Sequence, residues 1–269
     1  MTKEDKTFQQ LLDLTGRVAL VTGAGQGVGA ATARMLAELG AAVAVNDFYP
    51  ERAKETVNAI EAAGGRAYAV AADVTAWAAV TAMVAEIERE LGTVDILVNN
   101  AGNAGATHDA LEPPPPFWES TPDDWDRWTA VNLTGVMVAT RAVVGGMVER
   151  GRGRVITVIS EAGRQGEAGL VVYSAAKAGA AGFTRAIAKA TAPFGVTANC
   201  VALGAVRTPA IEAALAVEKV AAKIVRAYPV GRVGEPSDAA AMIAFLASDA
   251  AEWITAQTYP VNGGFSVAL

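Results

Sequence analysis

The sequence contains very few of the side chains that bind metals or form disulfides. Cys200 is the single cysteine and His108 the single histidine among 269 residues. An internal disulfide, a Cys/His zinc site and a paired-histidine metal motif are therefore excluded by count. A serine hydrolase is disfavoured too, because the one histidine lies beside a proline-rich loop and no G-x-S-x-G sequence occurs. Carboxylate-only metal binding stays open, and we expect no metal.

Clustered positive charge and long apolar runs are also lacking. Lys and Arg number 22 against 28 Asp and Glu, a formal net charge of −6. Nucleic-acid binding requires clustered cations that displace phosphate counterions, so we expect no nucleic-acid partner. An uncharged stretch at residues 190–206 is interrupted by Pro193 and Gly195, and the N-terminus lacks the apolar core of a secretory signal. We therefore expect no membrane association and a cytoplasmic location.

Short apolar runs alternate with longer alanine-rich stretches in which apolar residues recur at helical spacing. The short runs are apolar almost throughout, as in strands covered by helices on both faces. This order predicts an α/β fold: a single Rossmann-like, doubly wound parallel sheet of seven strands with helices on both faces. The expected strands are residues 17–22, 42–46, 67–71, 96–99, 154–159, 197–202 and 257–261. The expected helices are residues 29–39, 51–63, 76–91, 123–150, 173–192 and 236–248.

No break in composition marks a second domain. We expect an N-terminal extension at residues 1–16 and one Rossmann-type domain at residues 17–269. The segment 103–117 contains four consecutive prolines, which are too stiff for a helix or strand, so we expect a surface excursion with His108 at the surface. Residues 205–228 are helical by pattern, and we expect them to form a lid, with an ordinary crossover helix as the alternative.

The first expected strand runs into a glycine-rich turn and then a helix. Such a turn lets the backbone approach a pyrophosphate, whose charge is stabilised by free N–H groups at the helix N-terminus. The glycines fit two spacings, Gly25-x-Gly27-x-x-Ala30 and Thr22-Gly23-x-x-x-Gly27-x-Gly29, and spacing alone does not decide between them. The turn residues expected to contact the cofactor are Gly23, Gln26, Gly27, Val28 and Gly29.

Asp47 ends the second expected strand, at about the distance from the turn that the dinucleotide fingerprint requires. Its carboxylate can accept hydrogen bonds from ribose hydroxyls and would repel the additional phosphate of NADP. Neither Gln26 nor Phe48, which follows Asp47, is cationic, so NAD is the expected cofactor and Phe48 an expected contact. Arg52 is the residue most able to reverse this choice, and a turn cap is the alternative role for Asp47.

Tyr173 and Lys177 lie four residues apart on an expected helix, so both side chains lie on one face with a rise of about 6 Å. A phenol has a pKa near 10, and bringing it near neutrality takes roughly 3–4 kcal/mol, which a Lys cation can help supply. A half-buried tyrosine beside a surface lysine is the ordinary alternative. Ser160 ends the preceding strand, at the edge where ligands bind, and can donate to a carbonyl oxygen.

The whole constellation resembles the short-chain dehydrogenase/reductase family, and the resemblance extends from residue 17 to residue 261. The gap of 13 residues between Ser160 and Tyr173 agrees with that family. The matching motifs are Thr22-Gly-Ala-Gly-Gln-Gly-Val-Gly29, Asp73-Val74, Asn99-Asn-Ala-Gly102, Val131-Asn-Leu-Thr-Gly135, Ser160, Tyr173-Ser-Ala-Ala-Lys177 and Asn199-Cys-Val-Ala-Leu-Gly-Ala-Val-Arg-Thr208.

The resemblance implies a catalytic role for four residues. Tyr173 would be the general acid/base, and Lys177 would lower its pKa and bind the nicotinamide ribose. Ser160 would polarise the substrate carbonyl. Asn132 would hold a water that continues a proton relay from Lys177 to solvent.

The resemblance also extends the expected cofactor site. The family usually has Pro-Gly after the sixth strand, whereas this chain has Leu203-Gly204, which restricts the backbone less at the entry to the lid. Leu203 could instead contact the nicotinamide. The additional cofactor contacts implied are Asp73 and Val74 at the adenine, Asn100, Ala101 and Gly102 along the cofactor, and Val206 and Thr208 at the carboxamide.

The implied reaction is reversible NAD-dependent hydride transfer between a secondary alcohol and its ketone. Residues 45–47 and 160–179 look like parts of hydroxyacyl-CoA dehydrogenases, which makes a hydroxyacyl thioester one candidate substrate beside sugar alcohols, steroids and quinone-like ketones. A non-catalytic NAD-sensing module on the same fold and an NADPH-dependent 3-oxoacyl thioester reductase are the alternatives.

For several side chains beside the site, the sequence is compatible with more than one role. Glu161 and Arg164 could read a polar substrate or lie in a solvated loop. Trp118, Trp125 and Trp128 could belong to the core or to contacts between subunits. Because the corresponding helices commonly pack between subunits in the family, a homotetramer is expected.

Overall fold

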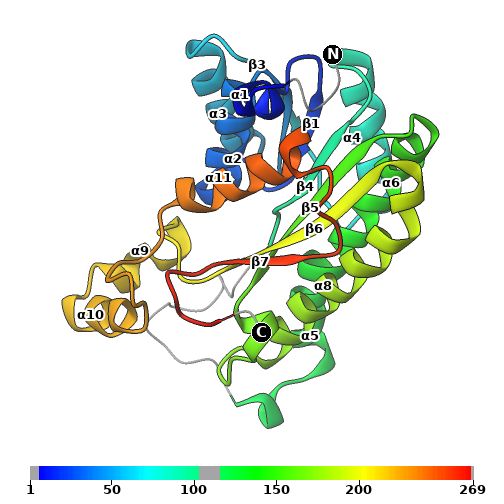
Figure 1. The fold of residues 1–269 in the computed structure, drawn as a ribbon. Coiled ribbons are helices and arrows are strands. Elements are labelled where there is room, and N and C mark those ends of the chain that lie inside the picture. Colours follow the sequence, from blue (N-terminus) through cyan, green and yellow to red (C-terminus); the bar gives the residue numbers. More distant parts are fainter. Residues whose placement is uncertain (1–5, 103–115, 268–269) are drawn as a thin grey trace.

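The computed structural model describes residues 6–102 and 116–267. Seven parallel strands form one sheet in the order β3-β2-β1-β4-β5-β6-β7 (Figure 1). The expected doubly wound sheet is confirmed, and its order reverses between β1 and β4, which places a ligand crevice at the carboxyl ends of these strands. The strands are β1 (Val18–Val21), β2 (Ala42–Asp47), β3 (Arg66–Ala71), β4 (Ile96–Asn99), β5 (Gly153–Ser160), β6 (Val196–Leu203) and β7 (Thr258–Val261).

Helices cover both faces of this sheet. The main ones are α2 (Gly27–Glu38), α3 (Pro50–Ala62) and α11 (Pro236–Ala247) on one face, and α4 (Trp77–Glu90), α6 (Gly135–Glu149) and α8 (Val171–Thr191) on the other. The shorter helices are α1 (Phe8–Leu12), α5 (Pro122–Thr129), α7 (Ala162–Gln165), α9 (Pro209–Leu215), α10 (Glu218–Arg226), η2 (Phe117–Glu119), η3 (Ala130–Thr134), η4 (Ala192–Phe194) and η5 (Asp249–Ala251).

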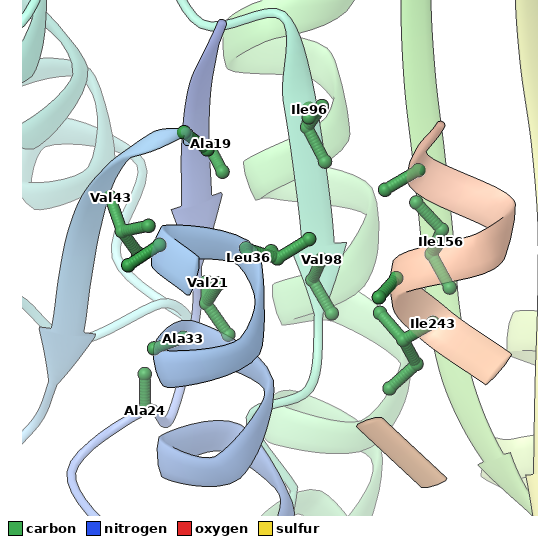
Figure 2. Close-up of a cluster of buried hydrophobic side chains, with 14 of the residues drawn as sticks. Ala19, Val21, Ala24, Ala33, Leu36, Val43, Ile96, Val98, Ile156 and Ile243 are labelled. Carbon is green, nitrogen blue, oxygen red and sulfur yellow. The ribbon is translucent and has the colours of Figure 1, made fainter. Parts of the chain in front are cut away.

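The core of the first face lies where α2 and α11 meet the central strands. Leu36 of α2 and Ile243 of α11 are fully buried against Val98 and Ile156 (Figure 2). The alanines of α2 bring that helix close to the sheet, because a methyl group fills little of the space between the layers. Small helix residues and branched strand residues thus fill the interior with few aromatic side chains.

The prediction of a single uninterrupted helix at residues 123–150 is wrong in one respect. The structure has α5, a π-helical turn at η3, and then α6. A π turn inserts one residue relative to α-helical spacing and is often found at functional sites. Here it turns Asn132 inward, where the side chain is fully buried.

The combined run Pro122–Glu149 is long and apolar enough to cross a membrane by length and composition, among the residues described. Its α6 portion packs against β4, β5 and α4. A helix that covers a buried sheet needs an apolar face, so this packing accounts for the composition.

The residues before β1 contain an element that was not expected. Thr7 and Gln10 cap α1 reciprocally, which satisfies backbone groups that would otherwise be unpaired in a short helix. Leu14 is buried in the core, and its backbone N–H donates to Leu39 O at 2.7 Å. The segment therefore packs on the sheet domain.

The expected lid segment forms two short helices. Thr208 precedes α9 and Pro209 occupies its first position, where a missing N–H leaves no hydrogen bond unmade. In Figure 1, α9 and α10 extend away from the sheet beyond the end of β6. The proline-rich segment 103–115, with His108, lies outside the described residues.

Candidate active site

The carboxyl end of β5 and the first turns of α8 bring three polar side chains together. Ser160 ends β5, and its hydroxyl forms a hydrogen bond with the half-buried Tyr173. Lys177, one turn further along α8, is buried and donates from Nζ to Val158 O at 3.0 Å. Its Nζ lies 5.8 Å from the centroid of the Tyr173 ring. The expected placement of both residues on one helix face is therefore observed.

Burial is the main influence on the pKa values of Tyr173 and Lys177. Burial lowers the pKa of the Lys177 ammonium to about 8. Burial also raises the pKa of the Tyr173 phenol, while the hydrogen bond from Ser160 opposes that rise. In the protein by itself Tyr173 is therefore a neutral phenol at pH 7, and Lys177 titrates near neutrality.

The π turn η3 adds Asn132 to this group. Its Nδ2 donates to Trp128 O at 3.0 Å. A Cβ atom on Gly102 would lie 2.8 Å from Asn132 Oδ1 and 3.1 Å from Lys177 Nζ. Gly102, which follows β4, thus allows the Asn132 amide and the Lys177 ammonium to approach the same point.

Trp128 forms one wall of the site, a role that its sequence position did not predict. Its ring packs edge-on against Tyr173, with centroids 5.8 Å apart and planes at 64°. Trp125 instead stacks on Phe117 at 5.5 Å and donates to Ser120 Oγ at 2.8 Å, and Trp118 is exposed. The sequence could indicate this role only weakly. Trp128 lies four residues before Asn132, and which side chains share a face of the helix there depends on the π turn η3.

The glycine-rich turn lies at the other side of the crevice. Gly27 has φ +55° where α2 begins, and a Cβ on Gly29 would lie 2.3 Å from Gly23 O. The Gln26 side chain makes no capping hydrogen bond within the described part of the chain, so α2 presents backbone N–H groups to the crevice. Thr208 lies over this turn, 3.2 Å from the position of a Cβ on Gly27.

Hydrogen bonds fasten the turn to β4. The Asn100 amide donates to Thr22 O and Gly23 O, both at 2.9 Å. The backbone N–H groups of Asn100 and Ala101 donate to Thr22 Oγ1 at 3.1 and 3.0 Å. Asn100 and Thr22 therefore hold the turn in place, and the sequence did not single out this role for Thr22.

Asp47 lies buried at the end of β2, beside the turn. Its Oδ2 accepts from Gly25 N and its Oδ1 from Tyr49 N, each at 3.0 Å. These bonds use about half of the positions at which a carboxylate can accept, which leaves capacity for further donors. Phe48 is exposed, and the Arg52 guanidinium stacks on the Tyr49 ring at 4.3 Å.

Asp73 and Val74 follow β3. Asp73 Oδ1 accepts from the backbone N–H and the hydroxyl of Thr75, at 2.9 and 2.7 Å. Val74 is buried and packs against Gly135 of α6. Both residues therefore shape the connection into α4.

The path after β6 differs from the family pattern at Leu203, and Tyr228 lies at this point. Its hydroxyl accepts from Ala205 N at 2.6 Å, and a Cβ on Gly204 would lie 2.8 Å from its ring. Val206 is buried and pairs with Gly234 in an isolated parallel bridge. A cavity of about 640 Å³ adjoins Ala205 and Val206 and extends between α11 and the residues after β7, away from Ser160 and Tyr173.

Neither of the two environments expected for Glu161 and Arg164 is observed. They lie in neither a solvated loop nor an open position for a substrate, because Glu161 is 4% exposed and accepts from Arg164 Nη1 at 2.7 Å. Ser266 near the C-terminus donates to the same carboxylate. The sequence could not show this pairing, since the partners are 105 residues apart.

The described residues fit a dinucleotide. The turn is built of glycines at positions where a Cβ would clash, the start of α2 presents N–H groups, and the Asp47 carboxylate that would accept from a ribose lies beside the turn. With Ser160 at the end of β5 and Tyr173 and Lys177 on α8, the fold and site define an oxidoreductase that uses a nicotinamide cofactor.

Comparison with known proteins agrees with this class. The chain belongs to the short-chain dehydrogenase/reductase family: the family model described as enoyl-(acyl carrier protein) reductase matches residues 23–266. The chain is 40% identical to (2S)-[(R)-hydroxy(phenyl)methyl]succinyl-CoA dehydrogenase subunit BbsD of Thauera aromatica, over 95% of this chain and 99% of that protein. It is 42% identical to an acetoacetyl-CoA reductase of Rhizobium meliloti, over 92% and 98% of the two chains.

A solved structure shares the fold. The chain superposes with a TM-score of 0.88 on a gluconate 5-dehydrogenase from Burkholderia cenocepacia, determined in complex with NADP and tartrate. The two are 32% identical, and the match covers 98% of this chain and 100% of that one. Dehydrogenase or reductase chemistry on alcohol and keto groups is therefore common to these relatives.

Proposed function

We propose that the protein catalyses reversible NAD-dependent hydride transfer between a secondary alcohol and its ketone. The observation that carries this proposal is the convergence of Ser160, Tyr173, Lys177 and Asn132 across the crevice from the glycine-rich turn. A bound nicotinamide would supply the hydride acceptor for oxidation of the carbinol carbon and the hydride donor for reduction of the carbonyl carbon. Every proton step then belongs to side chains of this chain.

Ser160 and Tyr173 handle the substrate oxygen. Ala162 N donates to Ser160 Oγ at 3.2 Å, which leaves the serine hydrogen free to point toward Tyr173 or a substrate oxygen. In the direction of reduction the carbonyl oxygen gains charge as the hydride arrives, and the Ser160 hydroxyl stabilises that charge. Tyr173 then donates its proton to this oxygen, and in oxidation it takes the proton back.

Lys177 and Asn132 complete the proton path. The raised pKa of Tyr173 opposes phenolate formation, so positive charge close to its oxygen is required. Lys177 supplies an ammonium whose lowered pKa lets it exchange protons near neutrality. Asn132, held through Trp128 O, orients a water that links Lys177 to solvent.

Asp47 supports NAD as the cofactor. Its buried carboxylate faces the turn and would repel the additional phosphate of NADP. The NADP in the gluconate 5-dehydrogenase and the cationic Arg52, whose guanidinium lies over the Tyr49 ring, support the alternative, an NADPH-dependent 3-oxoacyl thioester reductase. The cofactor is held by Gly23, Gln26, Gly27, Val28, Gly29, Asp47, Phe48, Asp73, Val74, Asn100, Ala101, Gly102, Tyr173, Lys177, Val206 and Thr208.

The substrate class that we propose is a hydroxyacyl thioester or its oxoacyl counterpart. Two relatives that align over nearly their full length are named for CoA thioesters, a substituted succinyl-CoA and acetoacetyl-CoA. Both identities, 40% and 42%, exceed the 32% identity to the gluconate 5-dehydrogenase. Thioester chemistry is therefore favoured over a sugar acid.

The test is a spectrophotometric assay of nicotinamide reduction and oxidation. Acetoacetyl-CoA, 3-hydroxybutyryl-CoA, the corresponding free acids and gluconate are offered with NAD(H) or NADP(H), to the protein and to Tyr173→Phe. We expect turnover of the thioesters with NAD(H) and a loss of at least about 10³-fold in Tyr173→Phe. Cofactor binding without turnover in both proteins would instead support an NAD-sensing module.

Residues 17–269 act as one catalytic domain with residues 205–228 as a lid. The protein works in the cytoplasm as a homotetramer on small-molecule substrates, without nucleic acid or membrane. Met137 of α6 and Val171 at the start of α8 are exposed apolar residues that a contact between subunits would cover. Mass measurement in solution tests the oligomeric state.

A further inference from the structure

The loop after Ser160 is held by a partly buried polar cluster that reaches the C-terminal end of the described chain. Glu161 Oε1 accepts from Arg164 Nη1 at 2.7 Å, and its Oε2 accepts from the Ser266 hydroxyl. Arg164 also donates to Ser266 Oγ at 2.9 Å and to Val267 O at 3.3 Å. We call Glu161, Arg164 and Ser266 the C-terminal latch.

The C-terminal side of the latch is itself ordered by hydrogen bonds. Asn262 Nδ2 donates to the carbonyl and the hydroxyl oxygens of Ser266, both at 3.1 Å, and Asn262 Oδ1 accepts from Gly264 N at 3.0 Å. The Phe265 ring lies 5.5 Å from that of Tyr228. Residues 262–267 therefore form a compact turn that presents Ser266 to Glu161.

The active-site side of the latch touches two catalytic residues. Glu161 starts the short helix α7, and the next N–H, that of Ala162, donates to Ser160 Oγ. At Gly163, a Cβ would lie only 2.7 Å from Lys177 Cβ, so α7 packs directly on the lysine. A displacement of α7 would therefore turn the Ser160 hydroxyl and shift Lys177 together.

Stability alone is a weak reason for such a cluster. A buried ion pair often contributes little net stability, because removing its charges from water costs about as much as their attraction returns. Its geometry, however, is demanding: the carboxylate accepts from two elements at once, and the guanidinium spans three groups. The arrangement is suited to holding α7 in one position.

We propose that the C-terminal latch positions Ser160 and Lys177, so that the C-terminal turn 262–267 is a required part of the active site. This inference rests on the proposed oxidoreductase function. The three latch residues are positioning residues, since they act on the reacting groups through α7. Their loss should lower kcat more than it changes cofactor binding.

The test compares kcat, KM for NAD and thermal stability in Ser266→Ala, Ser266→Thr and Glu161→Gln. Ser266→Ala removes one hydroxyl from a partly exposed turn, and we expect kcat to fall about tenfold, with KM for NAD changed less than twofold. Ser266→Thr keeps the hydroxyl and should restore most of the rate. Glu161→Gln should lower kcat further, because it leaves Arg164 without its charged partner.

Asp95→Asn is the matched control. Asp95 is also a buried carboxylate paired with an arginine, Arg152 at 3.1 Å, but it precedes β4 at the opposite edge of the sheet. This variant should lose thermal stability while keeping kcat, which separates loss of a buried ion pair from loss of positioning.

Wild-type kcat in folded Ser266→Ala, or an equal rate loss in Ser266→Thr, overturns the latch. If Glu161→Gln does not fold, the two Ser266 variants decide. Tyr173→Phe, assayed in parallel, tests the proposed function by itself. Full activity in Tyr173→Phe refutes that function, whereas an inactive Tyr173→Phe beside a fully active Ser266→Ala refutes the latch alone.

Discussion

Replacing Lys177 by methionine should stabilise the fold near neutral pH while abolishing catalysis. Lys177 is 4% exposed, and burial lowers the pKa of its ammonium from 10.5 to about 8. A difference of this size corresponds to about 3 kcal/mol by which the folded state disfavours the charged form at pH 7. Methionine has a similar length and carries no charge, so it removes this penalty.

The replacement also removes a favourable contact. Lys177 Nζ donates to Val158 O at 3.0 Å, and leaving a buried acceptor unpaired costs about 1–3 kcal/mol. We therefore expect Lys177→Met to exceed the wild type by roughly 1 kcal/mol in free energy of unfolding at pH 7. Stabilisation by loss of the lysine that we propose to be catalytic would show that the site is maintained at the expense of stability.

The pH dependence provides the sharper measurement. Between pH 8 and 10.5 the unfolded chain holds a proton on Lys177 that the folded chain has released, so raising the pH favours the folded wild type relative to the variant. The stability advantage of Lys177→Met should fall by about 3 kcal/mol across this interval and change sign. Urea unfolding of both proteins without cofactor, at pH 7 and at pH 10.5, measures the difference directly.

Lys189→Met is the control, because Lys189 lies on the same helix and is exposed. Its stability difference from the wild type should stay constant with pH. The stability difference between Lys177→Met and the wild type is expected to change by about 3 kcal/mol over this pH interval. A change of less than 1 kcal/mol, about a third of that, would refute the reasoning that burial disfavours the ammonium.

Three further changes test the cofactor site and the core. Asp47→Ala should raise KM for NAD about tenfold and reduce the preference for NAD over NADP, as steady-state kinetics with both cofactors would show; an unchanged preference contradicts the role of the carboxylate. Gly29→Ala places a Cβ 2.3 Å from Gly23 O, so calorimetric titration with NAD should detect much weaker binding, and unaltered affinity would mean that the turn adapts. Leu36→Ala should lower the free energy of unfolding by about 2–5 kcal/mol, because Leu36 is fully buried between α2 and the sheet; a loss below 1 kcal/mol in urea unfolding would indicate that the neighbouring side chains close the cavity.

The sheet and its helices were predictable because their signals are local. Short, continuous apolar runs bounded by turn residues, such as Val18–Val21, are typical of buried parallel strands. The edge that carries the site followed from the same pattern, since Asp47 and Ser160 end their strands and the carboxyl ends of parallel strands lie together. The break at η3 was missed because residues 130–134 contain no proline or glycine that would mark an interruption of the helix.

The sequence by itself determined the fold class and the set of polar residues at one edge of the sheet, because periodicity and strand ends are encoded in neighbouring residues. Only the tertiary structure decided the environment of those residues. It buried Lys177, which lowers the pKa of its ammonium, and brought Trp128 against Tyr173. It also joined Glu161 to Ser266 across 105 positions. Burial and long-range pairing depend on how all the elements pack together, and no local segment of the chain contains that information.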